Sequence, residues 1–166
     1  MELEKNVELN DNIDVNVGIK GLGGWLILVG IGYFIGIIRQ GILVKQAFDV
    51  YHNGTMKMLS NPQHPQYNSK LFWLVNMELI GSIVIIIVLV GALILFFSKK
   101  KIFPKYAIIF IVFSNLYLLL DIFMVDAIGL AVSADDISGA TQGFISAAIW
   151  ITYFIKSERV KNTFVN

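Results

Sequence analysis

The stretch that decides the fold runs from Ile80 to Phe97 and reads IGSIVIIIVLVGALILFF. It contains no charged residue, and as a helix rising about 1.5 Å per residue it is about 27 Å long. The hydrocarbon core of a bilayer is about 30 Å thick, and a helix of roughly 20 apolar residues crosses it. Extended back to Leu71, the stretch therefore predicts a membrane-spanning helix.

The composition of the whole chain likewise predicts that lipid surrounds much of it. Of its 166 residues, 56% are hydrophobic and 15% are charged, whereas soluble domains carry about 25% charged residues. The bilayer must therefore solvate much of the chain. The absence of cysteine from the sequence excludes a disulfide framework, a thiolate metal site and a cysteine nucleophile. A net charge of +1 provides no field to attract nucleic acid.

The apolar stretches predict an all-α integral membrane protein, a transmembrane bundle of four helices formed by residues 18–166. An outer loop is expected at about residues 44–70, and within it residues 44–59 are compatible with an amphipathic helix on the membrane surface. The four spans are expected at about residues 22–43, 71–97, 104–125 and 138–155.

The distribution of basic residues predicts that both termini are cytoplasmic. Lysines fill residues 98–105 and basic residues follow the fourth span at 156–161, whereas the turn at 126–137 carries only aspartates. Cytoplasmic segments close to the membrane carry the positive excess. Residues 1–17 are acidic and lack the basic start of a signal peptide. We therefore expect a mobile cytoplasmic tail before an uncleaved first span.

Two pairs of small residues predict close helix contacts. Gly32 and Gly36 lie four residues apart in the first span, and Gly139 and Gly143 do so in the fourth. Such pairs let helix backbones approach each other in lipid. We interpret both as contacts inside the bundle, and the alternative is a face of a homodimer, so that a homo-oligomer stays possible.

Ionisable residues near the outer ends of the spans predict a polar layer. Arg39 lies about 26 Å along the first span, counted from Leu22. Glu78 lies about 28 Å along the second span, counted back from Phe97, and Asp121 lies about 22 Å along the third, counted from Tyr106. With Gln142 they would form a layer at the outer mouth of the bundle, in which Asp121 pairs with Arg39. The alternative is that these side chains mark the ends of the spans and reach headgroups and water.

The sequence offers no catalytic constellation, and we predict no catalytic, cofactor-binding or metal-binding residue. Asp49, His52 and His64 in the outer loop are metal-ligand types, but their spacing matches no recurrent zinc signature.

Three segments resemble a known family. They are Gly21–Leu28 (GLGGWLIL), the turn from Phe96 to Pro104, and Trp150–Phe154 (WITYF) followed by Ser157–Phe164 (SERVKNTF). Together they resemble the small bacterial inner-membrane proteins with four spans that are classed as domain of unknown function 2569. The resemblance covers Gly18 to Phe164, although Thr152 stands where a proline is expected. It implies a bacterial inner membrane and four spans, and it implies no activity.

The carboxy-terminal part of the resemblance also has a physical interpretation. Basic and aromatic residues just inside the membrane suit contact with anionic headgroups, whereas the specific spacing favours a docking surface for a cytoplasmic or membrane partner. The residues of this motif are Trp150, Tyr153, Phe154, Ser157, Arg159, Lys161 and Phe164.

These observations favour a non-enzymatic membrane protein that assembles with, supports or regulates another envelope component, in contact with the lipid bilayer and with a membrane-protein partner. The alternative is a small transporter or ion-coupled subunit that uses the polar layer. The least favoured alternative is a membrane enzyme that uses Asp49, His52 and His64 with the outer carboxylates.

Overall fold

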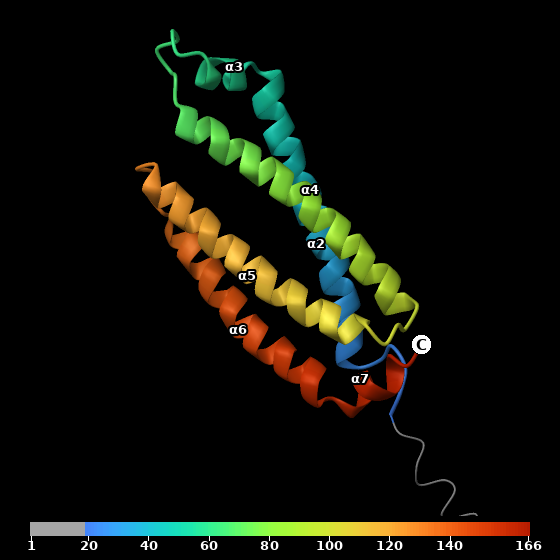
Figure 1. The fold of residues 1–166 in the computed structure, drawn as a ribbon. Coiled ribbons are helices and arrows are strands. Elements are labelled where there is room, and N and C mark those ends of the chain that lie inside the picture. The colour runs from blue at the N-terminus through green and yellow to red at the C-terminus, as the bar shows by residue number, and fades with distance from the viewer. Residues whose placement is uncertain (1–18) are drawn as a thin grey trace, which may run out of the picture.

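The computed structural model describes residues 19–166, which are helical throughout apart from short turns (Figure 1). The predicted acidic tail at 1–17 lies outside the described residues. The elements are α2 (Trp25–His52), α3 (Thr55–Ser60), α4 (Ser69–Phe97), α5 (Phe103–Ala127), α6 (Ala134–Lys156) and α7 (Glu158–Thr163).

Three helices, α2, α4 and α5, are long and apolar enough to cross a membrane, as the apolar stretches predict. The fourth predicted span is also helical, as α6, but α6 is not among these three. Its first half carries Thr141 and Gln142, which lower its hydropathy. α6 begins at a capping box, in which the Ser133 hydroxyl accepts from the Asp136 backbone N–H and the Asp136 carboxylate accepts from the Ser133 N–H.

The helix that contains the first predicted span continues beyond residue 43. α2 continues to His52, because Val44, Ala47 and Val50 stay half-buried and extend its packed face. Gly54 then turns the chain with a φ of 82°, a left-handed conformation that favours glycine. The short α3 follows and buries Met56 and Leu59. The expected loop at 44–70 thus contains the last turns of α2 and the whole of α3.

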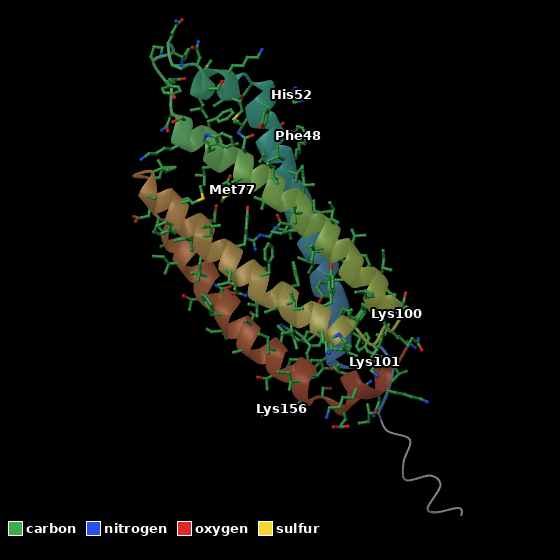
Figure 2. All side chains as sticks on the ribbon, in the orientation of Figure 1. Phe48, His52, Met77, Lys100, Lys101 and Lys156 are labelled. Atoms are coloured by element: carbon green, nitrogen blue, oxygen red, sulfur yellow. The ribbon has the colours of Figure 1, made fainter. Side chains whose placement is uncertain are left out.

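The helices form two antiparallel hairpins, α2 with α4 and α5 with α6, that converge at one end (Figure 1). We call this end, which holds the turn with Lys99, Lys100 and Lys101, the lysine end, and the opposite end the α3 end. α7 and the last residue of the chain lie at the lysine end. Figure 2 shows Lys100, Lys101 and Lys156 there, with Phe48 and His52 toward the α3 end.

The core lies at the lysine end. Phe103, fully buried at the start of α5, packs against Phe96, Phe154 and Phe164, with ring centroids 5.2, 5.9 and 4.5 Å away. These separations are typical of attractive aromatic pairs. α5 buries only Phe103 and Ala107, both near its start. The two hairpins are therefore joined mainly at one end.

Candidate functional site

The carboxy-terminal segment is built into the core. Phe154 and Phe164 are 4% and 3% exposed. The Thr163 hydroxyl accepts from the Gly21 N–H at 2.7 Å and lies 3.3 Å from the Gly21 carbonyl oxygen, to which it donates. The Asn166 backbone pairs with the turn between α4 and α5, where it accepts from Lys101 N–H at 2.7 Å. These contacts tie the segment before α2 to the chain end.

Arg159 packs against the two adjacent glycines before α2. A Cβ on Gly23 would lie 2.9 Å from Arg159 Nη1, and one on Gly24 would lie 3.6 Å from Nε. Gly24 also has a φ of 57°, which L side chains rarely adopt. The guanidinium thus lies directly against the backbone that starts α2. Trp25 in turn contacts Trp150 and Tyr153, with ring centroids 6.1 and 6.5 Å apart.

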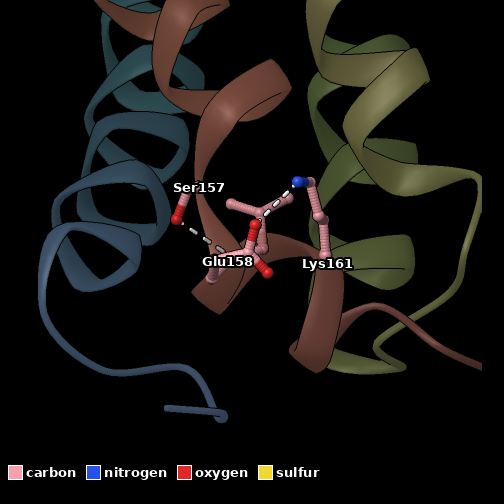
Figure 3. A network of polar contacts seen from close by, with 4 residues as sticks. Ser157, Glu158 and Lys161 are labelled. Carbon is pink, nitrogen blue, oxygen red and sulfur yellow. Dashed lines mark hydrogen bonds and ion pairs between the residues drawn. The ribbon is translucent and has the colours of Figure 1, made fainter. Parts of the chain in front are cut away.

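Of the seven motif residues only Lys161 is exposed, and it lies on α7 near Ser157 and Glu158 (Figure 3). The Ser157 hydroxyl caps α7 by accepting from Val160 N–H at 3.4 Å. Lys161 and Glu158 form an ion pair at 2.7 Å with side chains 56% and 73% exposed. Such a pair contributes about 0–1 kcal/mol. Of the seven motif residues, Phe154 and Phe164 are thus packed inside the chain, while Lys161 is exposed.

Two tyrosines of α5 connect the hairpins. Tyr106 Oη donates to the Val88 carbonyl at 2.9 Å, and Tyr117 Oη donates to the Met77 carbonyl at 3.2 Å. Both acceptors lie on α4, and tyrosines and acceptors are each spaced by three helical turns. Glycines make room, since a Cβ on Gly91 would lie 3.0 Å from the Tyr106 hydroxyl and Gly81 is similarly placed against Tyr117. A hydroxyl in an apolar surrounding needs an acceptor. The signal that our sequence interpretation missed is the pair of tyrosines 11 residues apart in one span, with glycines 10 residues apart in the preceding span.

An apolar groove lies between α4 and α5 on the α3 side of the core. It has a volume of about 360 Å³. Tyr117 and Gly81 form part of its wall, and Met77 projects on the side of α4 that faces α5 (Figure 2). Its lining residues are Trp73, Asn76, Met77, Ile80, Gly81, Val84, Phe113 and Tyr117.

Two carboxylates of the predicted polar layer lie near this groove. Glu78 on α4 follows the groove residue Met77, and Asp121 on α5 lies one turn beyond the groove residue Tyr117. Asp121 Oδ1 is buried and, among residues 19–166, has no hydrogen-bond partner. The same holds for Asn115 Oδ1 and Gln40 Oε1 within that range. Unsatisfied polar atoms are costly in a bilayer.

Arg39 does not join these carboxylates. Gly30 faces Phe96 and Gly36 faces Leu89, and this register places Arg39 level with Ile87 of α4. Glu78 precedes Ile87 by nine residues and therefore lies about 14 Å nearer the α3 end of α4. Counting from Leu22 placed Arg39 too close to the α3 end. α2 begins only at Trp25, and its first residues extend beyond the end of α4 at the lysine end. Over the described residues the Arg39 side chain forms no ion pair, with Asp121 or otherwise.

The four glycines predicted to pack are used differently. A Cβ on Gly36 would lie 3.2 Å from Leu89 Cδ1 on α4, and one on Gly143 would lie 2.8 Å from Asn115 Oδ1 on α5. Gly32 and Gly139 have nothing within 4 Å of that position. One member of each pair therefore contacts a neighbouring helix, and the other faces outward.

The polar residues in the first half of α6 are bonded locally. Gln142 Nε2 donates to Ser138 Oγ at 3.1 Å, and the Thr141 hydroxyl donates to the Ile137 carbonyl at 2.9 Å. Hydrogen bonds from the Ser133 side chain and backbone lower the pKa of Asp136 below its usual value. In the loop, His64 Nδ1 accepts from Gln66 N–H at 3.2 Å, and no group of three metal-ligating side chains occurs in the part of the chain that the structure describes.

Comparison with known families matches residues 19–165 to a family described as "Protein of unknown function (DUF2569)". The match covers nearly all described residues, including Gly21 and Thr163. We call the hydrogen bonds between these two residues the terminal latch. No curated protein and no solved structure matches the chain.

Proposed function

The chain belongs to the family of proteins of unknown function DUF2569, and from this premise we propose that it is a non-enzymatic membrane protein that assembles with, supports or regulates another protein of the bacterial envelope. The observation that carries the proposal is how few residues of α5 are buried within the chain. This apolar helix of 25 residues buries only Phe103 and Ala107 within the chain. Helices associate in lipid through close packing, and the groove beside α5 provides a surface for a partner helix.

The proposed arrangement is a four-span protein of the inner membrane with both termini in the cytoplasm. α6 has 23 residues, which is about 35 Å and enough to cross the hydrocarbon, and it packs along α5 at Gly143. Lys100, Lys101 and Lys156 lie at the end that also holds α7 and the last residue (Figure 2), and Gly21, before α2, is bonded there to Thr163. The positive-inside rule supports the cytoplasm on that side.

Cysteine labelling tests this orientation, because the natural sequence has no cysteine. In intact spheroplasts, a membrane-impermeant maleimide is expected to label Gly54→Cys and to leave Lys100→Cys unlabelled until the membrane is opened. Labelling of Lys100→Cys alone would reverse the proposed orientation.

Photo-crosslinking in living cells tests the assembly role. A photoreactive amino acid at Phe113, in the groove, is expected to give a discrete protein adduct, and the same residue at Ile109, which is 69% exposed outside the groove lining, is the matched control. Val84→Trp fills the groove and is expected to abolish the Phe113 adduct. Equal adducts from both positions, or an adduct that survives Val84→Trp, would contradict docking in the groove.

A second candidate is an ion-coupled subunit, which the presence of Glu78 and Asp121 in the apolar helices α4 and α5 favours. Membrane-embedded carboxylates of this kind mark ion pathways in transporters. Purified protein in liposomes would then support a cation flux that Asp121→Asn abolishes. A flux equal to that of empty liposomes would remove this candidate.

A further inference from the structure

Arg39 lies near the middle of the apolar layer and faces away from the chain. The α4 stretch Leu79–Phe97 contains no charged residue and is about 28 Å long, which is close to the hydrocarbon thickness. The contacts of Gly30 and Gly36 place Arg39 level with Ile87, near the centre of this stretch. The Arg39 side chain is exposed.

The surface around Arg39 suits a second helix. Ile35, Ile38 and Ile42 are 60%, 65% and 52% exposed, and they lie within one turn of Arg39 on α2. Gly32 lies two turns nearer the lysine end on the same side of α2, and there is open space beside its backbone. A small residue at such a position lets another backbone approach closely.

We propose that this face of α2 binds a membrane-spanning helix of another protein that carries a carboxylate near its middle. A charge near the bilayer centre is costly unless it is paired. The described spanning helices have no carboxylate at this level, since Asp49, Glu78, Asp121 and Asp126 all lie toward the α3 end. A parallel second copy would place its own Arg39 there, and like charges repel. Charge complementarity therefore favours a different, acidic partner. The inference rests on the proposed assembly role and names the chemistry of the partner.

A synthetic helix tests the pairing without the natural partner. We would reconstitute the full chain in phosphatidylcholine and phosphatidylglycerol vesicles with a labelled leucine and alanine peptide that has Glu, Gln or Lys at its centre, and measure association by energy transfer. The Glu peptide is expected to bind the natural sequence, and Arg39→Leu to weaken this binding about three- to tenfold, the range that interhelical polar contacts give. Arg39→Leu removes a lipid-facing charge and is expected to fold. Lys45→Leu, which removes a charge nearer the end of α2, is the matched control.

Two further arms separate other occupants of this face. Arg39→Cys labelled with bimane is expected to be quenched more by lipids with a spin label deep in the acyl chain than by lipids labelled near the headgroup. Shallow quenching would show that Arg39 reaches headgroup phosphates, and would overturn the inference. Energy transfer between two labelled copies that depends on Arg39 would also overturn it, in favour of a homo-oligomer.

The peptide-binding experiment can fail independently of the crosslinking experiment that tests the proposed function. Equal binding of the Glu peptide to the natural sequence and to Arg39→Leu would overturn the inference, whatever adducts form at Phe113. An absent Phe113 adduct would count against docking in the groove and would leave the peptide result unaffected.

Discussion

Gly81 is the position at which a single methyl group should separate the two hairpins. A Cβ there would overlap the Tyr117 hydroxyl and lie 2.5 Å from Cζ and 2.9 Å from Cε2 of the same ring. Tyr117 would have to rotate away and lose its hydrogen bond to the Met77 carbonyl. Loss of an interhelical hydrogen bond costs about 1 kcal/mol, and forcing a packed ring aside costs about 1–3 kcal/mol. Together these give about 2–4 kcal/mol.

The control for Gly81→Ala is Gly32→Ala. Both replacements gain the same helix propensity, up to about 1 kcal/mol, but Gly32 has open space. The free energies of unfolding, measured by denaturant titration in mixed micelles, are expected to differ between the two variants by about 2–4 kcal/mol. In a double-mutant cycle with Tyr117→Ala, which removes the ring, the cost of Gly81→Ala should largely disappear. Equal stabilities of Gly81→Ala and Gly32→Ala, or strict additivity in the cycle, would refute the close contact.

The remaining predictions concern helix packing, the terminal latch and the cap of α6. Gly36→Leu is expected to lower the unfolding free energy by about 1–3 kcal/mol through overpacking, and Gly32→Leu is expected not to lower it in the same titration. Thr163→Val removes both hydrogen bonds at the latch and is expected to cost about 1–3 kcal/mol, so unfolding at an unchanged denaturant midpoint would contradict the latch. Ser133→Ala should raise the pKa of Asp136 toward its usual value in an NMR titration, because the hydrogen bonds that lower it are lost. The stabilisation by Asp136 is present above its unfolded-state pKa and is lost as pH falls through the lower folded-state value, and this acid-dependent loss should be smaller in Ser133→Ala.

The latch also changes the interpretation of the family motif at the chain end. Phe164 and Thr163 are buried, so their spacing serves packing against Phe103 and bonding to Gly21. A proposed docking surface at the lysine end is therefore confined to the exposed residues, such as Lys161 and Glu158 (Figure 3).

The sequence by itself determined which parts of the chain are apolar helices. Hydropathy, the rise per residue and the caps are local properties, so the ranges of α4 and α5 could be read within one or two residues of their bounds. The lysines of the turn after α4 likewise identified one end of the bundle. The end of α2 was harder to predict, because the half-buried Val44 and Val50 continue a face that only contact with another element defines.

Only the tertiary structure decided where each polar residue lies along the bundle relative to the residues of neighbouring helices. Arg39 was counted along its own helix, but its depth depends on how far α2 is displaced against α4, which the contacts of Gly30 and Gly36 define. The bonds of Tyr106 and Tyr117 to α4 likewise depend on which helices are neighbours and in what register. Periodicity gives each helix its faces, whereas the relative displacement of two helices comes from side-chain packing between them.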